Sequence, residues 1–193
     1  MNYLGHSFFS KENESLFITG NVLGDFYKGR PEKLDYPQDL VNGIVFHRYL
    51  DKITDENPII HDLKASITDG RLFKGAIIDI FLDYFLAKNW NHFSSISLEI
   101  YSKNLYKLIG DSEFFLPENG KRTFFYLKKE NWIFNYQYID FIEDVLSRMG
   151  SHYKNGHILK NSIKYLKSDP NFYEDNFMKF IDTFIVTTKK SDF

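Results

Sequence analysis

Apolar side chains recur every three or four residues along most of this chain, which is the pattern of helices that bury one face. Alternation of apolar and polar residues, which is typical of a half-buried strand, is scarce. Glycine and proline separate the periodic segments, as at Gly29 with Pro31 and at Pro58. The pattern predicts helices over residues 13–27, 37–57, 58–67, 72–89, 95–109, 120–129, 138–153, 157–166 and 171–187, and a loop over 111–119.

The segment 72–89 is apolar over much of its circumference, so we expect it to be the central, buried helix. The chain has no low-complexity linker and no internal repeat with a period of 20–50 residues. Its 193 residues suffice for one sizeable hydrophobic core. The sequence therefore predicts one all-α domain, a single-domain helical bundle spanning residues 1–193.

The amino-acid composition excludes several classes of protein. Hydrophobic residues make up 43% and charged residues 26% of the chain, which is typical of a globular protein, and the net charge of −2 offers no global attraction for nucleic acid. No signal-peptide pattern begins the chain and no apolar run is long enough to span a membrane, so we expect a cytoplasmic protein without a membrane partner. Because cysteine is absent, any metal must be held by His, Asp, Glu and water.

Carboxylates and imidazoles interrupt the most apolar predicted helices. His47 and Asp51 are four residues apart, and so are Asp79 and Asp83, so each pair shares one helix face. Asp25 interrupts the first helix. Burying an unpaired carboxylate costs several kcal/mol, so these side chains need partners. Helices that each contribute an acid or an imidazole to the interior are how bundles build metal sites.

Each of these residues also has a purely structural interpretation. His47 and Asp51 can form a surface pair one turn apart, Asp25 can be exposed near a helix end, and Asp79 can lie on a solvated stripe. His6, close to Phe8 and Phe9, can be a core histidine bonded to the backbone. The remaining histidines are predicted to lie on the surface; they are His61, His92, His152 and His157. Serine-nucleophile and glycine-rich phosphate-binding motifs are absent.

Several blocks of the sequence together resemble the acyl carrier protein phosphodiesterases. The blocks occur in order and cover most of residues 1–153, which makes the resemblance specific. They begin with Asn-Tyr-Leu-Gly-His at 2–6 and Gly-Asn-Val-Leu-Gly-Asp-Phe-Tyr-Lys-Gly at 20–29, and continue at 36–43, 43–55, 79–90, 131–136 and 140–151.

The resemblance implies an HD-phosphohydrolase-like helical fold and hydrolysis of the phosphodiester that joins 4′-phosphopantetheine to a serine of holo-acyl carrier protein. It also implies a metal, Mn²⁺ with Mg²⁺ as the alternative, and an acidic acyl carrier protein as partner. Carried onto matching positions, the implied metal ligands are His6, Asp25, His47, Asp51 and Asp83. Of these, His6, His47 and Asp51 are the implied catalytic residues, with either imidazole as general acid. The predicted substrate-binding residues are Lys28 and Arg48, which the resemblance implies, and Arg30. Arg30 forms a basic rim with Lys28 and Lys33 that suits an acidic partner but is also typical of a solvated loop.

Two positions depart from the pattern of that family. Members commonly have Asp-His where this chain has Asp83 and Tyr84, and often His where it has Asn57. Two alternatives to the holo-carrier-protein activity therefore follow. One is a catalytically silent protein that binds the carrier protein, and the other is an enzyme that hydrolyses a small phosphodiester.

Overall fold

The computed structural model describes residues 1–10 and 14–190, and within these ranges every regular element is a helix, which confirms the all-α prediction. The longer helices are α2 (Ser15–Val22), α3 (Gln38–Asp55), α4 (Pro58–Ser66), α5 (Lys74–Lys88), α7 (Leu98–Asp111), α8 (Glu118–Lys129), α10 (Ile139–Ser151) and α13 (Pro170–Lys190). The short helices are α1 (Tyr3–Phe8), α6 (Trp90–Phe93), α9 (Trp132–Asn135), α11 (His157–Asn161) and α12 (Ile163–Ser168), with 3₁₀ turns η1 (Gly24–Phe26), η2 (Pro31–Lys33) and η3 (Glu113–Phe115).

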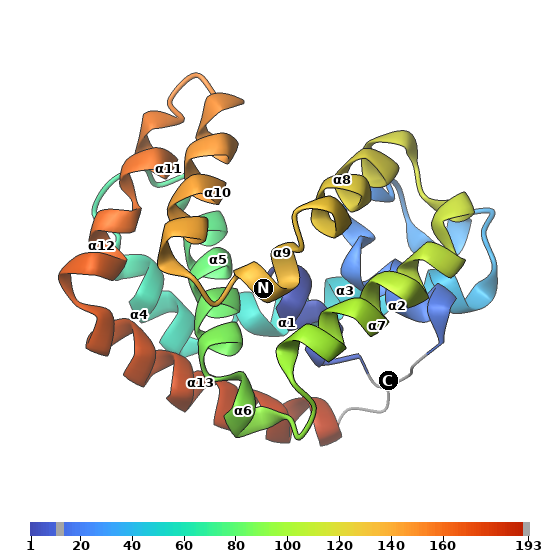
Figure 1. The fold of residues 1–193 in the computed structure, drawn as a ribbon, viewed down its shortest axis with the longest axis horizontal. Helices are drawn as coiled ribbons and strands as arrows, with labels where there is room; N and C mark the ends of the chain where they lie inside the picture. The colour runs from blue at the N-terminus through green and yellow to red at the C-terminus, as the bar shows by residue number, and fades with distance from the viewer. Residues whose placement is uncertain (11–13, 191–193) are drawn as a thin grey trace.

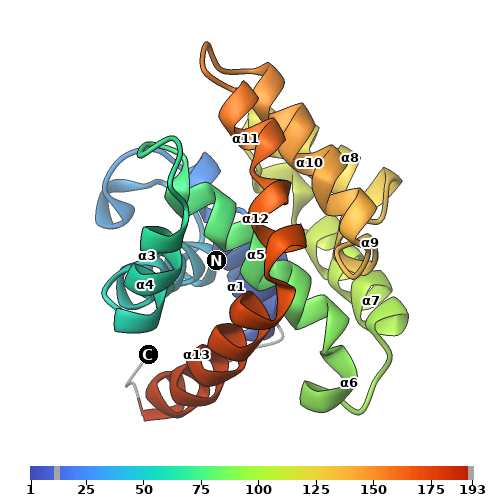
Figure 2. The same cartoon turned by 90° about the vertical axis from the view of Figure 1, so that its left-hand side faces the viewer.

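Helix α5 is the central helix, as its apolar composition predicts. It contacts α1, α4, α10 and α13, and most of its residues are buried, Asp83 among them (Figures 1 and 2). Its buried side chains belong to one hydrophobic core that extends from Met1 to Phe184. Because this core surrounds α5, a polar side chain on that helix needs a partner inside the protein.

Helices α2 and α3 pack closely because two glycines meet at their crossing. A Cβ atom added to Gly20 would lie 2.2 Å from the carbonyl oxygen of Leu40, and one added to Gly43 would lie 2.2 Å from that of Phe17. Any side chain at either position would force the backbones apart. This contact places the end of α2 beside the middle of α3, where His47 lies.

Helices α8 and α10 diverge as two arms from the short helix α9, with the N-terminus of the chain at their base (Figure 1). In the view turned by 90°, α11 and α12 lie along α10 and cover its outer side (Figure 2). The arms therefore rise from beside the start of α1, where Tyr3 meets Trp132 of α9 and the side chain of Asn2 donates to Tyr136.

Most predicted helices are present with ends shifted by a few residues, but three short ones were missed. The sequence pattern did not predict α1, α6 or α9, each of which is too short for a clear period. The first predicted helix, 13–27, is wrong in its second half, since α2 ends at Val22 and η1 follows; residue 13 lies outside the described residues. The helix predicted over 157–166 is split into α11 and α12, and the loop predicted over 111–119 contains η3.

Candidate functional site

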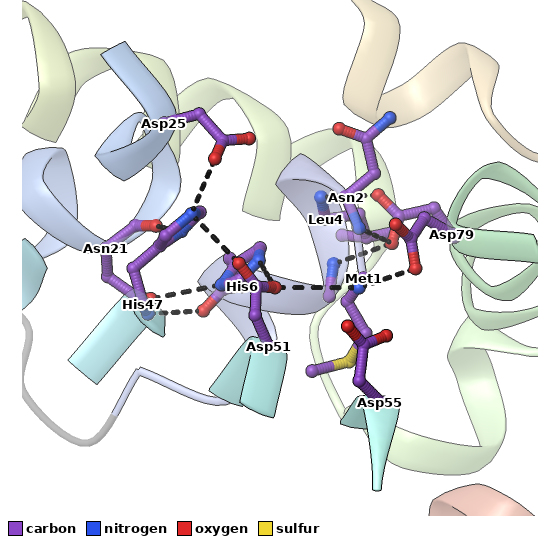
Figure 3. Close-up of polar contacts among 12 residues, drawn as sticks. Met1, Asn2, Leu4, His6, Asn21, Asp25, His47, Asp51, Asp55 and Asp79 are labelled. Atoms are coloured by element: carbon purple, nitrogen blue, oxygen red, sulfur yellow. Dashed lines mark hydrogen bonds and ion pairs between the residues drawn. The ribbon is translucent and has the colours of Figure 1, made fainter. Parts of the chain in front are cut away.

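Two buried imidazoles and one carboxylate converge between α1 and α3 (Figure 3). Nε2 of His6 lies 3.1 Å from Oδ1 of Asp51, and Nε2 of His47 lies 3.2 Å from Oδ2 of the same carboxylate. The two rings are stacked, with centroids 4.0 Å apart. Each of the three residues offers one ligand atom, and these atoms all lie within 4.8 Å of one another. We call these residues the His–Asp cluster.

Local sequence places these side chains. His47 and Asp51 are one turn apart on α3, so both point to the same side of the helix. Gly24 makes room for the imidazole of His47, since a Cβ atom there would lie 2.5 Å from the ring. His6 reaches the cluster from α1, which packs against α2 and α5. Helix α1 is therefore the element that brings the second imidazole to the site.

Asn21 fixes the orientation of both imidazoles. Nδ1 of His47 lies 2.7 Å from the backbone oxygen of Asn21, and Nδ1 of His6 lies 3.2 Å from its side-chain Oδ1. The amide nitrogen of Asn21 donates to the backbone oxygen of His6 and to Ser10, so its Oδ1 is the acceptor. Both Nδ1 atoms are therefore donors, and in the neutral rings each Nε2 carries a lone pair.

The two lone pairs then face a carboxylate. Nε2 of His6 is buried and has no hydrogen-bond partner, although Oδ1 of Asp51 lies 3.1 Å away. Two lone pairs opposite a carboxylate repel one another unless a proton or a metal ion lies between them. Two imidazoles and a carboxylate form a donor set that suits a divalent ion such as Mn²⁺. Asn21 fixes both imidazoles through their Nδ1 atoms, which leaves each Nε2 free to face the ion.

Charges within the cluster shift its pKa values. Burial raises the pKa of Asp51, but His6 and His47 outweigh this and hold it at about 2. Burial lowers the pKa of His6, and the neighbouring imidazole adds to this effect. Burial also lowers the pKa of His47, but Asp25 and Asp51 more than offset it, so its pKa lies above the usual value. The first proton of the cluster therefore resides on His47.

Asp25 lies at the mouth of the cluster. It belongs to the turn η1, its side chain is 84% exposed, and its Oδ1 lies 3.3 Å from Nε2 of His47. The hydrogen bond to His47 lowers the pKa of Asp25. A small cavity of about 210 Å³ opens here between η1 and α3, and Asp25, His47 and Asp51 are among its lining residues. Asp25 is thus close to the cluster but is not one of its three mutually adjacent ligands.

The structure places Asp83 outside the cluster, in contrast to the predicted ligand role. Its oxygens accept the backbone N–H groups of Asn2, Leu4 and Gly5, at 3.2, 2.8 and 3.0 Å. Asp83 is completely buried, and burial raises its pKa to about 7 although these donors favour the anion. Both oxygens are occupied because α5 lies beside the start of α1. Asp83 therefore anchors the helix that carries His6.

Asp79, which is one turn earlier on α5, also holds the start of α1. Its Oδ1 accepts a hydrogen bond of 2.9 Å from the α-amino group of Met1, which lies 3.9 Å from Oδ1 of Asp51 (Figure 3). The sequence pattern places Asp79 and Asp83 on one face but does not reveal what that face meets. Asn21 was missed too, and the only signal for it is its position within the block at 20–29.

The predicted substrate-binding residues lie beside the cluster, on the loop after η1 and on α3. Nζ of Lys28 donates to the backbone oxygen of Asp25, and Arg48 donates to the backbone oxygens of Tyr27 and Gly29. These contacts hold the loop that carries Asp25. Arg30 is exposed at the end of the same loop. The structure therefore shows a positioning contact for Lys28 and Arg48, while contact with a substrate stays a prediction.

The two positions that depart from the family pattern lie away from the His–Asp cluster. Tyr84 is partly buried on α5, where it packs against Phe85 and where the charges that act on it come from Lys88 and Glu174. Asn57 caps α4 by accepting the backbone N–H of Ile59.

The remaining histidines are all exposed, as predicted; they are His61, His92, His152 and His157. Within the described residues, none of the helices combines the length and apolarity needed to cross a bilayer.

Fold and site together define an all-α protein with a buried histidine–aspartate centre. The sequence pattern of the family described as acyl carrier protein phosphodiesterase matches residues 1–184. A protein named acyl carrier protein phosphodiesterase from Photorhabdus laumondii is 27% identical to this chain, and the match covers 100% of this chain and 98% of the relative. A protein of the same name from an Enterobacter species is 29% identical, and the match covers 98% of both chains. One of the same name from Shigella boydii is 30% identical over 93% of both chains. The chain belongs to the acyl carrier protein phosphodiesterase family and is a phosphodiesterase. No solved structure matches it, so the HD-phosphohydrolase-like fold remains a prediction.

Proposed function

We propose that this enzyme hydrolyses the phosphodiester between 4′-phosphopantetheine and a serine of holo-acyl carrier protein, in the cytoplasm and with Mn²⁺ or Mg²⁺ bound. The observation that carries this proposal is the His–Asp cluster, in which two Nε2 lone pairs of fixed tautomers face one carboxylate. His6, His47 and Asp51 would hold the ion. When bound, such an ion lowers the pKa of a bound water and neutralises charge on phosphoryl oxygens.

Asp25 and the two imidazoles have different roles in the proposed reaction. In the overall reaction, water attacks phosphorus, the bond to the serine oxygen breaks, and the serine oxygen takes up a proton. Asp25 is exposed beside His47, and its lowered pKa keeps it ionised, so it can orient the attacking water by accepting a hydrogen bond from it. The Nδ1 atoms of His6 and His47 are both directed at Asn21, so neither ring has a free N–H for the role of general acid while its Nε2 is a ligand.

The basic rim beside the cluster offers a place for the carrier protein. Lys28, Arg30 and Lys33 are exposed on the loop that leads away from Asp25. An acidic partner that docks on this rim would present its modified serine to Asp25 and His47, and opposite charges would speed the encounter. The position of Tyr84 away from the cluster favours an active enzyme over the catalytically silent alternative.

The test is to incubate holo-acyl carrier protein with the enzyme and Mn²⁺ and to follow the carrier protein by mass spectrometry. We expect loss of the 4′-phosphopantetheine mass, and no loss with Asp51→Asn or without added metal. A panel of small phosphodiesters is assayed in parallel. Hydrolysis of a small ester with an intact holo-carrier protein would favour the altered-substrate alternative, and no turnover of either would favour the silent one.

A further inference from the structure

A second cavity opens between the arms α8 and α10. Its volume is about 380 Å³, and side chains of both helices line it together with Trp132 at the start of α9. Figure 1 shows these arms diverging from α9, with the N-terminus at their base. The cavity is therefore on the same side of the molecule as the start of α1.

Apolar, hydroxyl and charged side chains all line this cavity. Val145, Met149 and the ring of Trp132 supply apolar surface, while Thr123 and Tyr126 supply hydroxyl groups. Arg148 is held by Glu130 at 2.6 Å and by Asp144 at 2.8 Å, and its guanidinium lies 5.2 Å from the centre of the Trp132 ring. Its Nε is buried and has no hydrogen-bond partner. Arg148 therefore lines the cavity with a guanidinium group that two carboxylates hold in place and that keeps one N–H without an acceptor.

Two aromatic rings connect the cavity with the catalytic region. The ring of Trp132 meets the ring of Tyr3 edge-on, with centroids 6.4 Å apart. Tyr3 belongs to α1, one turn before His6. Tyr3 also packs against the hydrophobic core, so it joins the wall of the cavity to the helix that carries His6. One wall of the cavity therefore contacts the helix that carries an imidazole of the His–Asp cluster.

We propose that this cavity binds the pantetheine arm of the substrate. The arm is a flexible chain of aliphatic segments and amides, so it matches a lining that offers apolar surface together with hydroxyl and other hydrogen-bonding groups. An ion pair is not needed, because the arm itself is neutral beyond its phosphate. This inference rests on the proposed function, since it assumes that the phosphodiester reacts at the His–Asp cluster.

Calorimetric titration of the metal-free protein with 4′-phosphopantetheine tests the cavity without any need for turnover. Met149→Trp fills the cavity, and we expect it to weaken binding about tenfold. Ser151→Trp adds the same ring to an exposed position of α10 outside the cavity and should leave the affinity unchanged. Tyr126→Ala, at an exposed position, gives a second variant if Met149→Trp does not fold. Equal affinities for wild type and both cavity variants, or no binding to wild type, would overturn the proposal.

Steady-state kinetics separate this inference from the proposed function. With holo-acyl carrier protein we expect Met149→Trp to raise KM about tenfold and to change kcat by less than about twofold. Hydrolysis of bis(4-nitrophenyl) phosphate, which has no arm, should be the same in both tryptophan variants. A wild-type enzyme that leaves holo-carrier protein intact would refute the proposed function. A wild-type enzyme that cleaves it, with no effect of Met149→Trp on KM, would refute the arm site alone.

Discussion

Asp51 and Asp83 are two carboxylates with the same predicted role and opposite surroundings. Asp51 is 39% exposed, faces two imidazoles, and has its pKa lowered to about 2. Asp83 is completely buried, accepts three backbone N–H groups, and has its pKa raised to about 7. The first carboxylate is available to a cation, whereas the second is used up in holding α1. A carboxylate on an apolar helix therefore predicts a partner, but not which kind of partner.

We expect the largest effect from a substitution that removes the charge of Asp51. We expect Asp51→Asn to lose Mn²⁺ binding and to lose activity on holo-acyl carrier protein by about 10³-fold, because the ion contributes several kcal/mol to catalysis. The metal-free variant should also lose some stability, because the lowered pKa of Asp51 means that the folded protein stabilises its anion. Metal analysis and mass spectrometry of the product provide the measurement. A variant that keeps stoichiometric Mn²⁺ would show that Asp51 is not a ligand.

Asp83→Ala should act on stability instead. The substitution leaves three N–H groups at the start of α1 without an acceptor, two of them buried, which we expect to cost about 3 kcal/mol of the free energy of unfolding. Urea unfolding measures this loss, and Asp83→Asn, which keeps one acceptor oxygen, should recover part of it. Unchanged stability combined with lost Mn²⁺ binding would instead make Asp83 a ligand, as the sequence predicts.

The third prediction concerns Asn21, which orients the two imidazoles that face Asp51. Asn21→Ala removes the acceptor for Nδ1 of His6 but keeps the backbone oxygen that holds His47. We expect Mn²⁺ affinity to fall about 10- to 100-fold, as is typical for residues that orient a metal-binding histidine. Calorimetry with Mn²⁺ is the measurement. Asn57→Ala removes the side-chain amide that caps α4, and it serves as the control for loss of an amide outside the His–Asp cluster. Equal affinities for the two variants would contradict the role of Asn21.

The pH dependence of Mn²⁺ binding tests which group carries the first proton. The pKa of His47 lies above 6.5 in the metal-free protein, so Mn²⁺ must displace a proton as the pH falls through that pKa. Affinity should then fall about tenfold per pH unit below the pKa and be constant above it. Asp25→Asn removes a neighbouring anion and should lower the pKa of His47, which moves the onset to lower pH. Reduced affinity at every pH would instead show that Asp25 is a ligand.

The smallest effect is expected at Tyr84. Because its phenol group lies near Lys88 and Glu174 rather than near the His–Asp cluster, Tyr84→Phe should change kcat and Mn²⁺ affinity by less than about twofold. Kinetics on holo-carrier protein and metal titration measure both quantities, with Asp51→Asn as the positive control. A large loss in Tyr84→Phe at unchanged stability would give this tyrosine a functional role that its surroundings do not suggest.

Sequence periodicity was sufficient for most of the fold. The central position of α5 and the shared face of His47 and Asp51 follow from spacing alone, since a helix repeats every 3.6 residues. The absence of cysteine restricted any metal site to imidazole and carboxylate ligands. The short helix α1 could not be found in this way, because six residues contain too few turns to show a period.

The tertiary structure decided how the polar residues are paired. Spacing within one helix says which residues share a face, but it does not say which other helix that face meets. Only the packing of α1 between α2 and α5 brings His6 to Asp51 and directs Asp83 to the backbone of α1. The residue types and their faces were thus readable in the sequence. The division of the carboxylates into one that faces a cation site and one that anchors a helix depended on contacts between distant segments.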